Sequence, residues 1–366
     1  MTTSIFGSTL SELQALCIAE GWPKYVASQL CDWMYKKRVC DFSLMSNLSV
    51  KVRGRLAQLD SESLQFTPAI VDCQISRDGT KKYLFQIAPN QSNDPLVNYQ
   101  AHNYVETVFI PVAHTSTEPS RATLCISCQR GCKMGCRFCV TGKQGFHGSL
   151  TTAQILHQIF DIPESTQLTN IVYMGMGEPM DNYDAVMRST EILTSDWGLG
   201  WSPTRITIST VGITPGIERF LNENRCHLAV SMHNPFHDER LEIMPMEKAF
   251  PLADTIQLLS HYDWSGQRRI SFEYTMLRNH NDSLRHADGI VKLLQPLKKN
   301  GGMPRVNLIR FHASPNAPFQ TSNTQTINSF MTYLNQHGIT CTLRASRGED
   351  IQAACGLLAG SKRENV

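Results

Sequence analysis

The sequence of 366 residues has no apolar run of roughly 18 residues, the length that a membrane-spanning helix needs. Its opening segment, MTTSIFGSTL, lacks the basic start and the uninterrupted apolar stretch of an export signal. Charge of one sign is not in excess either, because 34 Lys and Arg residues face 32 Asp and Glu residues. The strongly cationic field that marks many nucleic-acid-binding domains is therefore absent. We expect a soluble cytoplasmic protein without a membrane partner, most simply a monomer.

Cysteine, in contrast, is abundant, with twelve residues. In a small secreted domain such a number would predict disulfides. In a chain of this length without an export signal it favours metal binding or thiol chemistry. The length suffices for one large α/β domain with a smaller appendage.

The first part of the chain has a helical pattern. From Ser8 to about Leu59, apolar residues recur at helical spacing, with breaks at 21–23 and 41–47. The pattern predicts a small N-terminal helical domain over residues 1–62.

The next part, residues 63–117, changes to short runs of β-forming residues such as TKKYLFQI and NYVETVFIPV. They surround the turn-forming pair Asp78 and Gly79. We expect a β-hairpin linker region that leads into the main domain.

Residues 118–345 repeat a unit of apolar run, polar loop and amphipathic stretch. The apolar runs are TLCIS, NIVYM, RITIS, HLAVSM, RISFEYTML and RVNLIRF, and the helical stretches lie near 152–161, 183–195, 215–222, 252–261, 282–297 and 322–336. Such βα units predict a parallel sheet with both faces buried. Polar residues recur where the runs end, which favours a partial (β/α)6 barrel over a doubly wound sheet. Residues 346–366 follow as a C-terminal extension.

A CxxxCxxC motif, CKMGCRFC, follows the first of these runs and contains Cys132, Cys136 and Cys139. Three thiolates on one loop can bind three irons of a [4Fe–4S] cluster and leave the fourth iron open for chemistry. From the spacing alone, a zinc site with a distant ligand and metal-free thiols remain alternatives. Phe138 and Phe146 on the same loop are expected to shield a cluster from water.

The motifs together resemble the radical SAM (S-adenosylmethionine) superfamily, and within it the ribosomal RNA adenine methyltransferases of the RlmN/Cfr type. The resemblance covers nearly the whole chain. It rests on KYVASQLCDWMYKKRVCDF, VETVFIP, TLCIS, the cysteine loop, GMGEP, ISTVG, SMHNP, VNLIRF and RGEDIQAACG. It implies a radical SAM barrel with one [4Fe–4S] cluster on the three cysteines.

By the same resemblance, SAM is bound by residues at the ends of successive strands. They are Gly177, Glu178, Ser209, Ser231, Met232, His233 and Asn307. Taken singly, a serine that ends a strand is more often a local cap, and a lone histidine is more often structural. Their recurrence at successive strand ends favours a common site.

The resemblance also implies a reaction that uses two SAM molecules per turnover. One SAM methylates Cys355, and the second is cleaved to a 5′-deoxyadenosyl radical that removes hydrogen from the new S-methyl group. The methylene radical left on Cys355 adds to C2 of adenine. This carbon is too electron-poor to attack a SAM methyl group directly. Cys125 then releases the RNA through a transient disulfide with Cys355, and Glu106 matches the family's proton acceptor. The residues alone leave burial as an alternative for both cysteines, and Cys128 is taken as a bystander.

Basic residues give local evidence for RNA binding. They lie in the helical domain and around the cysteine loop: Lys36, Lys37, Arg38, Lys51, Arg53, Arg55, Arg130, Lys133, Arg137 and Lys143. Such groups neutralise phosphates, although a charge run is more often a solvated surface. The N-terminal domain resembles the family's RNA-contacting domain. The resemblance implies position 2503 of 23S rRNA as substrate, adenosine 37 of certain tRNAs in some members, and flavodoxin as electron donor.

Two rival hypotheses stay open from the sequence. The C8-methylating branch of the family, which confers antibiotic resistance on ribosomes, shares all these motifs. A non-catalytic metal-containing RNA-binding protein is the alternative from another class, and it predicts no SAM cleavage and no dependence on Cys355.

Overall fold

The structure is a computed structural model that describes residues 4–63, 66–88, 101–111, 121–264, 269–299, 302–313 and 317–359. Its main feature is a ten-stranded sheet in the order β1-β2-β3-β4-β7-β8-β9-β10-β11-β12. Every neighbouring pair from β4 to β12 is parallel. These strands are β4 (Ala122–Cys125), β7 (Asn170–Tyr173), β8 (Ile206–Thr210), β9 (His227–Ser231), β10 (Ile270–Met276), β11 (Arg305–Arg310) and β12 (Thr340–Leu343).

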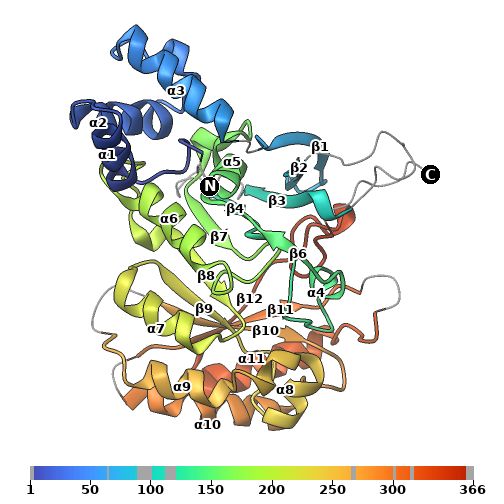
Figure 1. Cartoon of the computed structure of the whole chain (residues 1–366). Coiled ribbons are helices and arrows are strands. Elements are labelled where there is room, and N and C mark those ends of the chain that lie inside the picture. The colour runs from blue at the N-terminus through green and yellow to red at the C-terminus, as the bar shows by residue number, and fades with distance from the viewer. Residues whose placement is uncertain are drawn as a thin grey trace, which may run out of the picture.

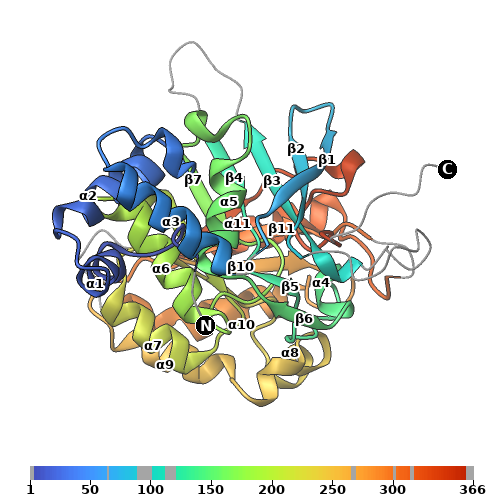
Figure 2. The same cartoon turned by 45° about the horizontal axis from the view of Figure 1, so that its top comes forward.

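Helices connect these strands and cover the outside of the curved sheet (Figures 1 and 2). The main crossover helices are α5 (Thr152–Phe160), α6 (Tyr183–Thr194), α7 (Thr214–Glu223), α9 (Leu252–Ser260), α10 (Leu284–Lys299) and α11 (Thr324–Gln336). Each lies within about two residues of a predicted helical stretch. The shorter helices are α4 (Val140–Lys143) and α8 (His237–Ile243), and 3-10 turns span Ala101–Asn103, Ser165–Gln167, Pro203–Arg205, Pro245–Lys248 and Glu349–Ile351.

The α/β fold class and the partial barrel are confirmed, with one addition. The parallel strand β12 follows the six predicted ones. It is a short edge strand in which only Cys341 is buried. Its sequence, TCTL, therefore lacks the continuous apolar run that predicted the other strands.

The β-rich region extends the same sheet. β1 (Ala69–Ile75) and β2 (Lys81–Gln86) form the predicted antiparallel hairpin around Asp78 and Gly79. β3 (Tyr104–Pro111) pairs antiparallel with both β2 and β4. This region is therefore continuous with the barrel.

A two-stranded ribbon encloses the cysteine loop. It consists of β5 (Gln129–Gly131) and β6 (Phe146–Ser149), which pair antiparallel. The backbone N–H of Cys132 donates to the carbonyl of Gly145 at 2.8 Å. The loop is thus held by the ribbon instead of following β4 directly.

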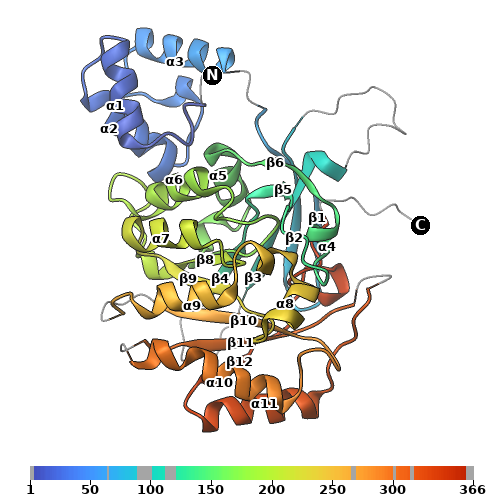
Figure 3. The same cartoon turned by 60° about the horizontal axis from the view of Figure 1, so that its bottom comes forward.

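The N-terminal helices pack beside α5 and α6 (Figures 1 and 3). They are α1 (Leu10–Ala19), α2 (Tyr25–Cys31), which continues as a π-helical turn over Asp32–Lys36, the 3-10 turn Phe42–Leu44, and α3 (Val50–Glu62). α1 begins at a capping box formed by Thr9 and Glu12. One apolar core runs from this helical unit through the barrel. Within the described ranges, no helix is both long and apolar enough to span a bilayer.

Candidate active site

A cavity opens where the parallel strands end, at the mouth of the barrel. Nine of the residues predicted to act in catalysis, SAM binding or cluster binding line it: Cys132, Cys136, Cys139, Gly177, Glu178, Ser209, Ser231, His233 and Cys355. The other four, Glu106, Cys125, Met232 and Asn307, lie behind this lining. The structure therefore brings together predicted residues from the ends of β7, β8 and β9, from the cysteine loop and from the C-terminal extension.

The three cysteines of the loop approach this cavity from one side. Cys136 is buried, and Cys132 and Cys139 are partly exposed. Burial raises the pKa of the Cys132 thiol to about 12, a cost that iron would offset by binding the thiolate. Among the described residues, no group of three or more His, Cys, Asp or Glu side chains is placed to hold a single metal ion. The donor set fits a [4Fe–4S] cluster, in which each thiolate binds a different iron.

The GMGEP loop after β7 lines the same cavity as the cysteines. Gly177 has φ +102°, and a Cβ there would lie 2.8 Å from the backbone nitrogen of Gln129, so only glycine fits. The Glu178 carboxylate accepts from the backbone N–H groups of Met180 (3.0 Å) and Val211 (2.9 Å). Glu178 therefore joins the loops after β7 and β8. Burial raises the pKa of Glu178 to about 7.

A row of polar side chains crosses the strands on the interior side. Ser231, Glu273, Asn307 and Thr342 are register neighbours on β9 to β12. The Asn307 amide donates to Glu273 at 2.8 Å, and the Thr342 hydroxyl donates to Asn307 at 3.1 Å. Asn307 thus reaches the cavity through Glu273, which lines it.

His233 sits at the end of β9 in a left-handed conformation, with φ +54°. Its Nδ1 accepts from the backbone N–H of Thr275 at 2.9 Å, and its ring meets that of Phe138 edge to face at 4.7 Å. Burial, together with the nearby Arg240 guanidinium, lowers the pKa of His233 to about 3. The ring is therefore neutral near pH 7 and is oriented by the strand beside it.

Arg240 on α8 is a buried cation that the sequence analysis did not identify. It donates to the carbonyls of Val211 (2.7 Å), Ser231 (2.8 Å) and Met232 (2.9 Å) and pairs with Glu247. The Met232 side chain is fully buried, so this residue contributes to the site through its backbone carbonyl, which accepts from Arg240. Arg240 joins the loops after β8 and β9 at the mouth of the barrel.

Cys125 and Cys355 come together although they are distant in the sequence. The Arg344 guanidinium lies close enough to interact with the charge of both sulfurs. Burial is the main cause that raises the pKa of Cys125 to about 12, and the nearby Cys355 sulfur adds to the rise. Arg344 lies beside Glu273, with 3.4 Å between the charged atoms. All twelve cysteines lie in the described ranges, and all are free thiols in this structure.

Glu106 on β3 is buried away from the cavity lining. Its carboxylate pairs with Lys82 at 3.0 Å and accepts from the backbone N–H of Ala359 at 2.6 Å. It therefore holds the end of the segment that carries Cys355.

Sequence reasoning missed Arg344, Glu273 and Arg240. Arg344 follows β12, the strand that the pattern did not predict. Glu273 lies within a predicted strand, where an acidic residue in an apolar run was an available signal. Arg240 carried no local signal, because its role arises from packing.

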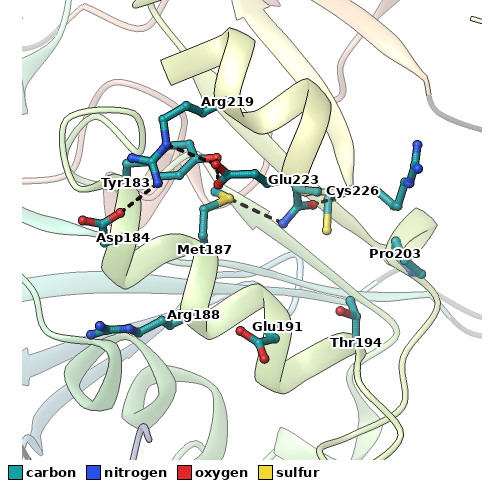
Figure 4. Close-up of a pocket in the computed structure, with 12 residues that line it drawn as sticks. Tyr183, Asp184, Met187, Arg188, Glu191, Thr194, Pro203, Arg219, Glu223 and Cys226 are labelled. Carbon is teal, nitrogen blue, oxygen red and sulfur yellow. Dashed lines mark hydrogen bonds and ion pairs between the residues drawn. The ribbon is translucent and has the colours of Figure 1, made fainter. Parts of the chain in front are cut away.

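A second cavity, of about 410 Å³, lies between α6 and α7 (Figure 4). Three of its charged groups pair with one another: Arg219 contacts both Asp184 and Glu223 at 3.3 Å. None of the residues predicted for the site lines it, and we assign it no role.

The parallel barrel and the three-cysteine loop at its mouth are those of a radical SAM enzyme. A model of the radical SAM superfamily matches residues 126–288, and a model of the ribosomal RNA large subunit methyltransferase N-terminal domain matches residues 3–61. The chain belongs to the RlmN family of dual-specificity RNA methyltransferases.

The similarity to relatives extends over the full length. A probable dual-specificity RNA methyltransferase RlmN of Porphyromonas gingivalis is 48% identical, covering 99% of this chain and 98% of the relative. The Parabacteroides distasonis relative of the same name is 49% identical, covering 98% and 97%. A crystal structure of a radical SAM methyltransferase from Sphaerobacter thermophilus is 35% identical, with a TM-score of 0.84 over 98% of this chain and all of that one.

Proposed function

We propose that this protein methylates C2 of an adenosine in RNA, at position 2503 of 23S rRNA and at adenosine 37 of tRNAs, through a methyl group carried on Cys355. One observation carries the proposal. Cys355, near the end of the chain, lines the same cavity as the three loop cysteines and neighbours Arg344 and Cys125. A purely structural RNA-binding protein would not need this convergence.

The chain's own residues divide the work at this site. Cys132, Cys136 and Cys139 would hold a [4Fe–4S] cluster, which would supply the electron that cleaves SAM. Gly177, Glu178, Ser209, Ser231, Met232, His233 and Asn307 position SAM against it. Glu106 is the proton acceptor of the family, and in this chain its carboxylate reaches the backbone of the C-terminal extension.

The sulfur chemistry balances at Cys355 and Cys125. The Cys355 sulfur loses its proton and takes a methyl group from the first SAM, which leaves as S-adenosylhomocysteine. A hydrogen atom then passes from this S-methyl group to the radical derived from the second SAM, and the resulting carbon radical bonds to C2. The adduct radical then loses one electron, which the oxidised cluster would take up, and the C2 proton. The Cys125 thiolate attacks the Cys355 sulfur, the carbon–sulfur bond breaks as the disulfide forms, and the electron pair left on carbon takes a proton to complete the methyl group. A thiol reductant would return the two cysteines to thiols for the next turnover.

We assign RNA contact to the helical domain, residues 1–62. The β-rich region, residues 63–117, connects this domain to the barrel. The barrel spans 118–345 and the Cys355 extension 346–366. Flavodoxin is the electron donor that suits the family, and we expect the protein to act as a monomer.

The test is anaerobic incubation of the iron–sulfur-reconstituted protein with methyl-labelled SAM, dithionite and an unmodified 23S rRNA fragment. Nucleosides are then compared with standards by mass spectrometry. The expected products are 2-methyladenosine, 5′-deoxyadenosine and S-adenosylhomocysteine. Cys355→Ala should give none of the methylated nucleoside while retaining the brown colour of the cluster.

Each other outcome has a definite meaning. If 8-methyladenosine is the sole product, the C2 assignment is wrong and the C8 branch is right. If SAM is cleaved and RNA is unmodified, the substrate is wrong. A colourless protein with stoichiometric zinc would support the non-catalytic alternative.

A further inference from the structure

Two histidine rings stack beside the mouth of the barrel. His102 lies in the 3-10 turn before β3, and His147 lies on β6. Their ring centroids are 3.6 Å apart with an interplanar angle of 28°. His102 is exposed, so one face of the pair is open to solvent.

The pair is held in place by the ribbon around the cysteine loop. Arg130 on β5 donates to the carbonyl of His102 at 3.2 Å, and a ring nitrogen of His147 contacts the carbonyl of Gln144 at 2.9 Å. Burial is the main cause that lowers the pKa of His102, and the neighbouring His147 and Arg130 add to it. The hydrogen bonds favour a fixed position of the two rings, and the lowered pKa favours an uncharged ring at His102.

A third aromatic residue lies on the same strand. Phe146 precedes His147 on β6 and is 37% exposed. The ammonium of Lys133 lies 4.3 Å from its ring centroid and 2.9 Å from Asp181. Lys143, on α4 between β5 and β6, is also exposed.

We propose that His102 and His147 form a stacking platform for unpaired RNA bases next to the target adenosine. Bases splayed from their stack bind proteins by stacking on exposed aromatic side chains. The nearby basic groups Arg130 and Lys143 supply the charge that complements the phosphates between those bases.

The ribbon connects the platform directly to the cysteine loop. β5 ends at Gly131, and the next residue is Cys132 of the candidate cluster loop. A base stacked on His102 is therefore held at a fixed distance from the cavity, because the ribbon is hydrogen-bonded to the loop at Gly145. This inference rests on the proposed function for the identity of the RNA, and it adds the residues that position it.

The experiment uses the full-length, reconstituted protein and the 23S rRNA fragment. The RNA dissociation constant is measured by fluorescence anisotropy for the wild type, His102→Ala, and the double variant His102→Ala with His147→Ala. We expect the double variant to bind RNA about 5- to 150-fold more weakly, which corresponds to about 1–3 kcal/mol of base stacking. His102→Phe should restore most of the affinity, because it keeps an aromatic face.

A matched control exists at the C-terminal end of α11, where Tyr333 and the capping residue His337 stack at 4.1 Å. His337→Ala removes one ring of a similar pair in another part of the molecule and should leave the RNA affinity unchanged. Formation of S-adenosylhomocysteine without RNA reports whether each variant still folds and binds SAM.

If the double variant forms S-adenosylhomocysteine normally and binds RNA within twofold of the wild type, the platform does not exist. If His102→Phe binds as weakly as His102→Ala, stacking is not the cause and the proposal is wrong. A wild type that makes no methylated RNA, but whose RNA affinity depends on His102, would overturn the proposed function and leave the platform standing.

Discussion

At the scale of single residues, Arg344 links the parts of the candidate site. Its guanidinium lies beside the Glu273 carboxylate, and its charge acts on both Cys125 and Cys355. The thiolate form of cysteine is the nucleophile, and a nearby cation stabilises it. Arg344 is therefore a positioning residue for the sulfur chemistry.

Cys125→Ala should trap a covalent adduct between the protein and the RNA, because no thiol then attacks the Cys355 sulfur. The adduct is measured on a denaturing gel with labelled RNA. Cys128→Ala is the matched control, since Cys128 is also buried and lies three residues away. Free, fully methylated RNA from Cys125→Ala would remove the resolving role from this residue.

Arg344→Met should slow the release of RNA from Cys355 by the Cys125 thiolate by about tenfold, equivalent to about 1.4 kcal/mol. Burial raises the pKa of Cys125 to about 12, and the Arg344 charge opposes this rise. The thiolate fraction, and with it the release rate, should therefore increase as pH is raised from 7 to 9. Arg344→Lys should retain most of the rate. If Arg344→Lys slows release as much as Arg344→Met does, the positive charge is not the cause and the role is only structural.

At the scale of elements, the β1–β2 turn clasps the C-terminal extension (Figure 2). The Ser76 hydroxyl donates to Asp350 at 2.6 Å, and the backbone N–H of Gly348 donates to Asp78 at 3.2 Å. Although burial raises the pKa of Asp78, hydrogen bonds from Thr80, Ser76 and Gly348 lower it to about 2 overall. The clasp therefore stays intact above the usual carboxyl range and weakens only as pH falls toward 2.

Replacing both acids of the clasp, Asp78→Asn with Asp350→Asn, should loosen the segment that holds Cys355. We expect hydrogen exchange over residues 347–359 to accelerate by about tenfold or more, since hydrogen bonds to charged groups contribute about 1.5–3 kcal/mol. Methylation of Cys355 should slow in parallel. Asp72→Asn, a partly exposed change on the same hairpin, is the control. Unchanged exchange in the double variant would mean that other contacts hold the extension.

At the scale of the whole molecule, the helical unit and the barrel share a core. The Phe6 ring lies 4.7 Å from that of His157 and 5.8 Å from that of Phe160, both on α5. Glu12 pairs with Arg188 of α6 at 3.2 Å. The orientation of the helical unit relative to the barrel mouth is set by these contacts.

Phe6→Ala should destabilise the protein by about 3–5 kcal/mol, the usual cost of truncating a buried phenylalanine. The measurement is denaturant unfolding, in which we expect the helical unit and barrel of the wild type to unfold together. Tyr25→Ala, at a position 63% exposed, should change stability by no more than about 0.5 kcal/mol. Two well-separated transitions in the wild type would contradict the shared core.

The sequence by itself determined the α/β class, the crossover helices and the cysteine loop. These features are local: strands and helices follow from the period of their apolar residues, and Cys132, Cys136 and Cys139 are neighbours in the chain. The family resemblance added the residues at the strand ends that are predicted to bind SAM.

Only the tertiary structure decided which distant groups meet. Cys355 reaches the cavity because the β1–β2 turn and Glu106 hold the C-terminal extension, and Arg344 meets Glu273 because β12 pairs beyond β11. The shared core and the exposed stack at His102 likewise depend on the packing of separate segments. Such contacts leave no periodic signal in the sequence, since each depends on the final geometry of elements far apart along the chain.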